Sequence, residues 1–350
     1  MEKIDKKNRI ESLGVYFPEK IETIEETVSE MKNKQPFDLK KITGIEERRV
    51  YSKNESCYKI ALQAVKDCLS KSKYEAKDID LIIVPSISRF HNGSNKQLFE
   101  PPLSLYIKTT LGMENAIYFD ISNACAGMMT GIYIINSMIK SGTIKTGLVV
   151  SGENITCIAE TAKKEINDPW DSQFGSLTVG DSGAAVIIDE AEDEHDYIDY
   201  IELLTAAEHA ELCIGKPSDL NAGFALYTDN NEMHKKDRIE LFAHFIEKYY
   251  KETGRSMESE NFDWIIHHQV GIKAIKNFTK YIEESSNFKL AEPLNCVEKY
   301  GNTATTSHFI SLYHNLNNGK LKPGSKVLAI PAASGIITGC LSVKITNLKK

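Results

Sequence analysis

A cysteine among small residues is the first candidate for chemistry in this sequence. Residues 120–135 read DISNACAGMMTGIYII, which places Cys125 after a polar segment and before an apolar run. Ser122 or Asn123 can cap a helix that begins here. A thiol at a helix N-terminus has its thiolate stabilised and its pKa lowered. We therefore interpret Cys125 as a candidate nucleophile, although a buried packing cysteine fits the same spacing.

Two later stretches place polar groups at the ends of predicted elements. IIHHQVGIKAI (265–275) ends an apolar strand with His267 and His268. Consecutive strand residues point to opposite faces, so we expect only one of these histidines to face a site. KYGNTATTSH (299–308) places the amide of Asn302 just before a predicted helix. A histidine satisfied in the core and an Asn-capped helix start are the structural alternatives.

Composition limits the classes of protein to which the chain can belong. It has 350 residues, of which 41% are apolar and 26% charged, and a formal net charge of −7. These values favour a soluble globular protein with a large core and disfavour nucleic acid as a general partner. No apolar run approaches the roughly 18 residues of a membrane span, and the first residues lack a secretory signal.

The seven cysteines predict neither disulfides nor a metal site. They fall at positions 57, 68, 125, 157, 213, 296 and 340, an odd number without any C-x-x-C spacing. In a chain of this length, such a distribution favours reduced thiols in the cytoplasm. We expect six of the seven to be small buried hydrophobic residues, with Cys125 as the exception.

Strand-like and helix-like stretches alternate along the chain, which predicts an α/β fold with parallel strands. Apolar strands are expected at 80–88, 147–153 and 326–335, and segments 160–175 and 205–235 are expected to be loops. Helical periodicity marks the stretches 55–71, 102–111, 126–141, 237–252, 270–284 and 304–316.

A weak internal repeat links the two halves of the chain. Asp78 pairs with Asn261 at an offset of 183, and Leu148 pairs with Val327 at 179. Between them, Cys125 pairs with Asn302 at 177, so both residues are expected at matching ends of two helices. In α/β folds the loops after such strands meet at one crevice, where ligands bind.

Taken together, these stretches resemble β-ketoacyl-acyl carrier protein synthase III, a condensing enzyme of the thiolase-fold superfamily. The resemblance implies an α/β, thiolase-like, five-layered αβαβα fold from two similar βαβαβαββ halves, 1–190 and 191–350. It also implies a cytoplasmic homodimer. In family order, the matching stretches are ITGIEERR (42–49), DIDLIIVPS (78–86), FDISNACAGMMTGI (119–132), VVSGE (149–153), GDSGAAV (180–186), DWIIHHQ (263–269) and YGNTATTS (300–307).

The resemblance implies that Cys125, His268 and Asn302 are catalytic. Cys125 would take an acyl group from a thioester, and a malonyl thioester would then lose carbon dioxide and attack it, in a fatty-acid-like or specialised-metabolite (polyketide) pathway. Backbone N–H groups of Cys125 and of Ser334 or Gly335 are the expected oxyanion donors. Two alternatives remain open: acyl transfer from Cys125 to an alcohol or amine, and a non-catalytic partner subunit.

Substrates rather than cofactors are implied, carried as thioesters on coenzyme A or on the phosphopantetheine of an acyl carrier protein. Lys273, Lys276 and Lys280 share one helix face, which suits docking of an acidic carrier protein. Asp38 and Ile42 stand where the family commonly has a Trp and an Arg for the coenzyme A nucleotide, and WDSQFGSLT (170–178) lacks a further Arg. These departures remove the obvious partners of the coenzyme A nucleotide, so the choice between a coenzyme A primer and a carrier-bound primer stays open.

The acyl pocket is expected next to the nucleophile. Met128 follows Cys125 in the sequence, and methionine adapts to pocket shape. The segment 88–101 resembles a loop that in the family reaches the partner's acyl pocket, and here it contributes Phe90 and Phe99. A polar surface loop is the alternative reading of this segment.

Overall fold

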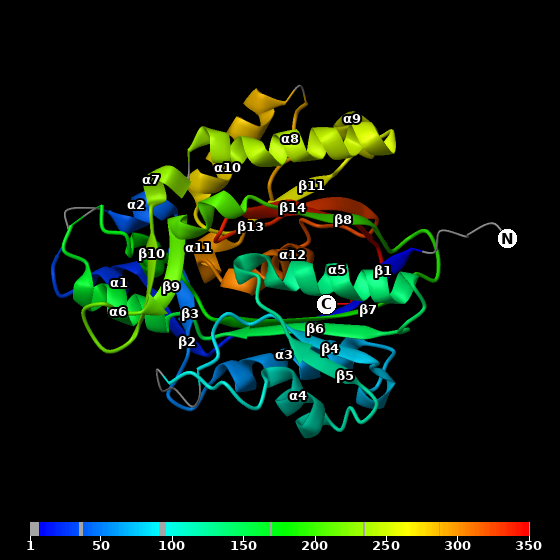
Figure 1. Cartoon of the computed structure of the whole chain (residues 1–350), viewed down its shortest axis with the longest axis horizontal. Helices are drawn as coiled ribbons and strands as arrows, with labels where there is room; N and C mark the ends of the chain where they lie inside the picture. Colours follow the sequence, from blue (N-terminus) through cyan, green and yellow to red (C-terminus); the bar gives the residue numbers. More distant parts are fainter. Residues whose placement is uncertain are drawn as a thin grey trace.

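The computed structural model describes residues 7–34, 38–90, 96–168, 170–233, 235–286 and 288–349. Five layers of helices and strands alternate (Figure 1). Helices α3 (Cys57–Lys71) and α4 (Leu103–Leu111) form one outer layer, and α8 (Lys236–Thr253) and α10 (Ile272–Ser285) form the other. Helices α5 (Gly127–Lys140) and α12 (Ser307–Asn317) lie between the sheets. The predicted α/β thiolase-like class is confirmed.

The two sheets repeat one strand order. In the N-terminal half the order is β5-β4-β6-β7-β1, and in the C-terminal half it is β11-β12-β14-β8. Strand β4 runs parallel to β6 and β11 parallel to β12, while the remaining pairs of the order, apart from the parallel β4–β5, are antiparallel. A single pair, Asn8 with Ile198, joins the sheets. The strands are β1 (Asn8–Tyr16), β4 (Leu81–Val84), β5 (Ile117–Asp120), β6 (Gly147–Glu153), β7 (Ser182–Glu190), β8 (Tyr197–Thr205), β11 (Trp264–His267), β12 (Ser325–Ile330) and β14 (Ile337–Ile345).

Short elements complete the fold. Strands β2 (Lys20–Thr23) and β3 (Glu47–Val50) form one hairpin-like pair, β9 (Cys213–Pro217) and β10 (Phe224–Thr228) form another, and β13 (Ala332–Ala333) pairs with β14. The short helices are α1 (Ile24–Ser29), α2 (Leu39–Thr43), α6 (Cys157–Glu165), α7 (Asn230–Met233), α9 (Met257–Glu260) and α11 (Val297–Tyr300), with 3-10 turns η1 (Ala76–Asp78), η2 (Ala124–Ala126), η3 (Phe174–Thr178), η4 (Ala207–Leu212) and η5 (Ala304–Thr306). Within the described ranges, no helix has both the length and the apolar character needed to cross a membrane.

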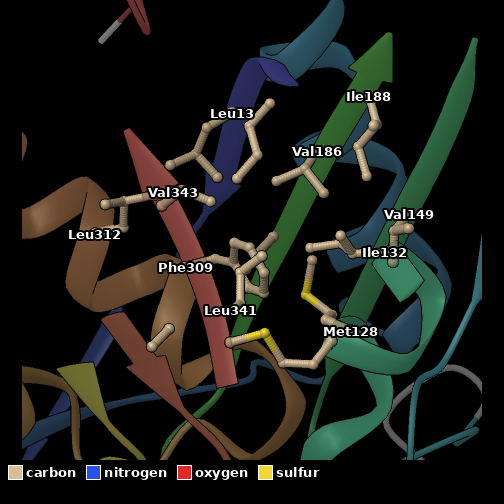
Figure 2. Packing of buried hydrophobic residues seen from close by; sticks show 14 of the residues in the cluster. Leu13, Met128, Ile132, Val149, Val186, Ile188, Phe309, Leu312, Leu341 and Val343 are labelled. Atoms are coloured by element: carbon tan, nitrogen blue, oxygen red, sulfur yellow. The ribbon is translucent and has the colours of Figure 1, made fainter. Parts of the chain in front are cut away.

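The main core surrounds the two central helices. Helix α5 is apolar on nearly every side, as a helix enclosed between two sheets must be. Figure 2 shows Met128 and Ile132 of α5 near Val186 of the N-terminal sheet, and Phe309 of α12 near Leu341. The central layer thus fixes the N-terminal ends of α5 and α12 relative to each other, which positions the residues that precede them.

Most of the expected long elements are confirmed, while one expected loop is wrong. Helices α3, α4, α5, α8, α10 and α12 and strands β4, β6 and β12 lie within a few residues of the predicted ranges. Segment 205–235, expected to be a loop, instead contains η4, the β9–β10 pair and α7. Segment 160–175 begins within α6. A strand of only four or five residues shows little periodicity in the sequence, so its pairing is decided by tertiary contacts.

Candidate active site

Cys125 lies in a tight turn at the start of the central helix α5. The turn is η2, and Ala124 within it has a left-handed φ of 45°. Asn123 does not cap the helix as expected; its Nδ2 donates instead to Thr130 Oγ1 at 2.7 Å. Gly127 permits close packing, because a Cβ there would lie 2.7 Å from Pro85 Cβ. The backbone thereby holds the thiol just ahead of the helix.

The environment of the Cys125 thiol corrects the expected direction of its pKa. Burial raises the pKa of Cys125 above its ordinary value, and nearby Cys213 and Glu153 shift it the same way. The sequence predicted a lowered pKa from the helix N-terminus, but desolvation of a thiolate outweighs that dipole. The free protein therefore holds Cys125 as a thiol at neutral pH, with its side chain partly exposed to a cavity.

Asn302 lies in a second tight turn, before the other central helix. Its backbone is fixed on both sides, since its N–H donates to Thr178 O and its C=O accepts from Gly180 N–H, both at 2.9 Å. Its side-chain Oδ1 accepts from Ala304 N–H at 3.0 Å. With Oδ1 engaged in this way, the Nδ2 group remains to donate toward the cavity that Asn302 lines. The preceding Gly301 has a left-handed φ of 65°.

His268 follows strand β11 and points to the inner side of the C-terminal sheet. Its ring stacks on that of His308, with centroids 5.8 Å apart. His308 Nε2 lies 3.0 Å from Ile330 O, so it acts as the donor there. Burial, followed by the His308 charge, lowers the pKa of His268 to about 3. His268 is therefore a neutral imidazole near pH 7, in which one ring nitrogen donates a hydrogen bond and the other accepts one.

His267 points to the other face of β11, yet it lines the same cavity. Its Nε2 lies 3.1 Å from Thr279 Oγ1 of α10, and its ring meets Phe278 edge-on. The expectation that only one of the two histidines faces the site is wrong. The cavity passes over the end of β11, so it reaches both faces of the C-terminal sheet.

One large cavity brings the three predicted catalytic residues together. Cys125, His268 and Asn302, which come from three distant stretches of the chain, all line a cleft of about 1070 Å³. This volume lies at the upper end for small-molecule sites. Near the mouth, Ile42 is 39% exposed and Trp170 82% exposed. Thus WDSQFGSLT, which lacks the expected Arg, contributes an aromatic ring instead.

The predicted oxyanion donors in the last loop are only partly placed at the site. Ser334 lines the cavity, but its hydroxyl donates to Cys213 Sγ at 3.0 Å, and Gly335 is not among the lining residues. Instead, Ala333 packs with Ala126, and Cys125 contacts that cluster. Strand β13, which ends at Ala333, contacts the turn that holds Cys125, so its N–H groups join Ser334 and Gly335 as candidate oxyanion donors.

None of the three residues predicted for the acyl pocket lines the cavity. Met128 is fully buried in the main core and does not line the cavity (Figure 2). Met128 lies in the first turn of α5 and belongs to the core cluster between the two sheets. Phe99 is 81% exposed, while Phe90 is buried in a cluster that Cys125 contacts. Of the three predicted acyl-pocket residues, Phe90 is therefore the one that lies near the thiol.

The three predicted docking lysines lie together on α10. Lys273, Lys276 and Lys280 are all exposed, and Lys273 also lines the cavity. Lys280 Nζ lies 3.6 Å from a Glu284 carboxylate oxygen, so its charge is partly balanced. The first two lysines therefore present the stronger positive charge beside the site.

Cys213 is a cavity residue that the sequence analysis missed. It was expected to be one of six buried cysteines, but only the cysteines at 57, 68, 157, 296 and 340 are buried. Cys213 begins β9 and shares the cavity with Cys125. The β9–β10 pair was expected to be a loop, so nothing in the sequence placed it at the active site.

A buried charge cluster supports the segment that holds Asn302. Arg48 donates to Leu177 O at 2.9 Å and to Val179 O at 3.0 Å, and Val179 bridges to Asn302. Arg48 also pairs with Glu22 at 2.6 Å. Arg48 and Glu22 thus connect the N-terminal β2–β3 pair to the Asn302 turn.

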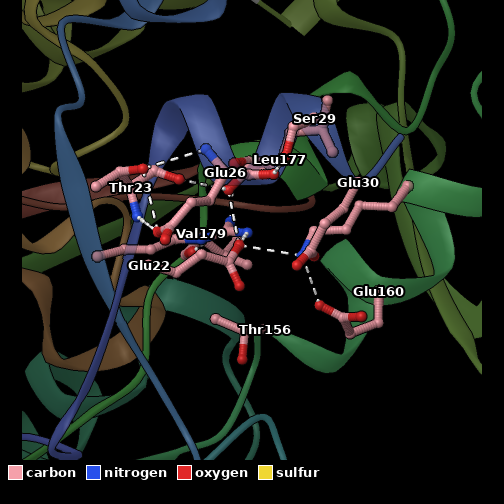
Figure 3. Close-up of polar contacts among 12 residues, drawn as sticks. Glu22, Thr23, Glu26, Ser29, Glu30, Thr156, Glu160, Leu177 and Val179 are labelled. Atoms are coloured by element: carbon pink, nitrogen blue, oxygen red, sulfur yellow. Dashed lines mark hydrogen bonds and ion pairs between the residues drawn. The ribbon is translucent and has the colours of Figure 1, made fainter. Parts of the chain in front are cut away.

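The acidic side chains in this cluster are held by a lysine. Glu22, Glu30 and Glu160 lie close enough to share a cation, and the Lys163 ammonium lies 2.6 to 3.1 Å from each of them. Figure 3 shows the carboxylates of Glu22, Glu30 and Glu160 gathered around this point. The group therefore has its cation supplied by the protein.

Family models match both halves of the site. The model described as 3-Oxoacyl-[acyl-carrier-protein (ACP)] synthase III matches residues 119–205, and its C-terminal counterpart matches residues 254–345. The first range contains Cys125, and the second contains His268 and Asn302. The beta-ketoacyl-[acyl-carrier-protein] synthase III of Bacillus pumilus is 27% identical over 337 residues, and that of Listeria innocua 26% over 341. Each comparison covers 95% of this chain and 97% of the relative.

Solved structures with the same fold are similar over nearly the whole chain. Cerulenin-bound OleA of Xanthomonas campestris has a TM-score of 0.82 at 22% identity and covers 97% of each chain. The 3-oxoacyl-[acyl-carrier-protein] synthase III of Aquifex aeolicus has a TM-score of 0.78 at 23% identity and covers 96% of this chain and 99% of its own. At these identities the likeness concerns the fold.

Proposed function

The chain belongs to the 3-oxoacyl-[acyl-carrier-protein] synthase III family, and on that premise we propose that it is a decarboxylating condensing enzyme. It takes an acyl group from a thioester onto Cys125 and joins that group to a malonyl thioester. The observation that carries the proposal is the meeting of Cys125, His268 and Asn302 in one cavity.

The first step transfers the acyl group to sulfur. Cys125 sulfur attacks the thioester carbonyl, the bond from that carbon to the carrier sulfur breaks, and the carrier leaves as a thiol with the proton that Cys125 gives up. The tetrahedral oxyanion requires N–H donors, of which the backbone of Cys125 is one and the β13 end at Ala333 is the second candidate. Exchange between thioesters has little free-energy cost, which suits a cysteine better than a serine.

The second step forms the carbon–carbon bond. The malonyl carboxylate leaves as carbon dioxide, and its electron pair develops as enolate charge on the thioester oxygen. His268 and the Asn302 Nδ2 group can both donate to that oxygen, and one such donor typically contributes about 10²–10³ in rate. The enolate carbon attacks the acyl carbonyl on Cys125, the bond from that carbon to the Cys125 sulfur breaks, and the sulfur leaves as a thiolate that takes a proton from water to restore the thiol. The product is a β-ketoacyl thioester.

The direct test combines the protein with acyl and malonyl thioesters and measures carbon dioxide and β-keto product. We expect both, in equal amounts, and we expect no β-keto product from Cys125→Ala. An unchanged rate of β-keto product formation in Cys125→Ala rules the mechanism out. Transfer of the acyl group to an alcohol or amine without carbon dioxide release supports the non-condensing alternative instead.

The exposed lysines of α10 support an acidic carrier protein as partner. Lys273 and Lys276 lie at and beside the cavity mouth, where a positive surface attracts an acidic protein and its phosphopantetheine arm. Lys276→Glu is expected to raise the apparent KM for a carrier-bound substrate and to leave KM for a free pantetheine thioester nearly unchanged. Equal changes for both substrates would exclude docking at this face.

The edge of the N-terminal sheet supports a homodimer. Strand β5 pairs with β4 on one side only among the described strands, and its Ile117 is 52% exposed. An apolar open edge of this kind is suited to pairing with a second copy of the chain. Analytical ultracentrifugation is expected to give a dimer for the wild type and a monomer for Ile117→Lys.

The free thiols support a reducing, cytoplasmic location.

A further inference from the structure

The active-site cavity has an arm that the proposed chemistry does not use. Beyond His267, the cavity continues over the end of the C-terminal sheet and enters the outer layer between α8 and α10. We call this the C-terminal arm. Its walls are the side chains of Ile239, Phe242, Phe278, Ile282, Ile330 and Ile337.

The C-terminal arm is apolar and enclosed. Phe242 is 3% exposed and Ile282 2% exposed, and both belong to the core cluster beneath the two outer helices. The His267 imidazole at the entrance of this region uses its Nε2 on Thr279. The arm therefore offers contact area for apolar atoms and few hydrogen-bond partners.

The chemistry of the walls selects the occupant. A phosphopantetheine arm carries two amides, which lose hydrogen bonds to water when they enter an apolar site. Most of the charged and amide side chains that line the cavity belong to other segments, such as Asp171, Asp229, Asn230, Asn231 and Lys273, while Arg238, Asn277 and Thr338 stand beside the apolar walls of the arm. An aliphatic chain has no polar atoms to satisfy, and each methylene that it buries contributes about fourfold in affinity, or about 0.8 kcal/mol.

We propose that the C-terminal arm binds the aliphatic chain of a medium- or long-chain acyl group carried on Cys125. The inference rests on the proposed function for the thioester chemistry. Along α10 the lining runs from Ala274 to Ile282, which is about 12 Å at 1.5 Å per residue. Met128, which the sequence analysis placed in the acyl pocket, belongs to the main core and leaves no space for a chain there.

The test compares acyl-coenzyme A donors from acetyl to hexadecanoyl, with acyl-Cys125 measured by intact-mass spectrometry in single turnovers. We expect kcat/KM for decanoyl to exceed that for acetyl at least tenfold. Ile239→Trp, which fills the arm, is expected to lower the decanoyl-to-acetyl ratio at least tenfold. Phe242→Leu, which deepens it, is expected to move the preferred chain to a longer one.

A matched control has the same substitution outside the cavity. Ile21 of β2 is 44% exposed and does not line the cavity, so Ile21→Trp is expected to keep the wild-type ratio. Thermal unfolding of each variant verifies that it folds. An unchanged ratio in Ile239→Trp overturns the proposal, as does a wild-type rate that does not depend on chain length.

A second readout separates this proposal from the proposed function. Isothermal titration calorimetry with free decanoate needs no acyl transfer. Binding to the wild type that weakens at least tenfold in Ile239→Trp supports the C-terminal arm even if no donor acylates Cys125. In that case the condensing function fails and the site for the chain remains. Equal decanoate affinities in the two proteins overturn the arm.

Discussion

The turn before α5 and the turn before α12 have the same backbone and different chemistry. Each is a 3-10 turn that leads directly into a central helix, and Ala124 and Ala304 hold matching left-handed φ values of 45° and 52°. The two alanines are 180 residues apart. The residue equivalent to Cys125 is therefore Thr305, and the sequence pairing of Cys125 with Asn302 at 177 is corrected by three positions.

The surroundings of the two turns explain the difference. Cys125 is partly exposed to the cavity, whereas Thr305 is 1% exposed and bonds to Glu153 and Ser151. The first turn presents a side chain to substrate, and the second is closed by hydrogen bonds and presents Asn302 instead. Under the proposed function, the two similar turns would divide the roles of nucleophile and enolate stabiliser between them.

The largest expected effect comes from moving the thiol between the turns. Cys125→Ala is expected to lower acylation by about 10³-fold or more. Adding Thr305→Cys to it is expected to restore nothing, because position 305 faces Glu153 and not the cavity. Intact mass after incubation with an acyl thioester measures both. An acyl adduct on the double variant would show that the turns are interchangeable.

Removing the amide donor of the second turn separates the two chemical steps. Asn302→Asp keeps the shape and the contact with Ala304 N–H but removes the Nδ2 donor. We expect decarboxylation to fall by about 10²–10³, and acylation of Cys125 to fall much less. Carbon dioxide release and acyl-enzyme mass are measured on the same samples. An equal fall in both steps contradicts the division of labour between the turns.

The Asn302 turn, unlike the Cys125 turn, depends on the buried Arg48. Arg48→Met removes the closest cation of the Glu22 carboxylate, which keeps Lys163 and the Thr27 hydroxyl, and it removes the contacts with Leu177 O and Val179 O. Breaking a buried pair typically costs about 3–5 kcal/mol. Urea unfolding measures the loss, and Ile21→Trp again provides the control. A decrease in the free energy of unfolding of less than about 1 kcal/mol would show that the Asn302 segment does not depend on Arg48 for its stability.

The same variant has a pH signature. Arg48 lowers the pKa of Glu22 to about 2, although burial opposes it. A lowered pKa stabilises the fold above the ordinary Glu value and loses that stabilisation as pH falls toward the folded value. Wild type is therefore expected to lose this contribution between about pH 4.5 and 2. In Arg48→Met the folded-state pKa of Glu22 lies nearer its ordinary value or above it, so this acid-dependent loss is expected to be smaller than in the wild type, as urea unfolding across pH will show.

The smallest effect tests whether the two turns are equally strained. A left-handed alanine costs roughly 1–2 kcal/mol, and glycine removes that cost but adds unfolded-state entropy worth about 0.4–1 kcal/mol. Ala124→Gly and Ala304→Gly are each expected to stabilise the fold by about 1 kcal/mol or less, and by similar amounts. Chemical denaturation measures both. Shifts of opposite sign would mean that only one turn carries strain.

Long periodic elements and the family stretches were predictable from the sequence. Helix α5 and strands β4 and β6 carry strong apolar patterns, so their positions follow from local chemistry. The positions of Cys125, His268 and Asn302 follow from motifs. The catalytic roles of these three residues, and the division of the chain at residue 190, stay predictions.

What the sequence did not predict depends on contacts between distant segments. The thiol pKa depends on burial that no local pattern reports. Cys213 reaches the cavity through a strand pair without clear alternation, and His267 joins the site only because the cavity bends over the end of β11. Met128 was misplaced because adjacency in sequence was taken for adjacency in space.

Glu153 joins the second of these turns to a distant segment of the chain through hydrogen bonds. Its buried carboxylate accepts from Ile87 and Ser88 N–H groups, from the Ser88 hydroxyl and from Thr305 Oγ1, at 2.6 to 3.0 Å. We call this set of hydrogen bonds the Glu153 junction. A substitution that removes one of its partners leaves the other polar group buried without that hydrogen bond. Descendants of this gene can therefore diversify the cavity walls one residue at a time, whereas the junction has to change as a set.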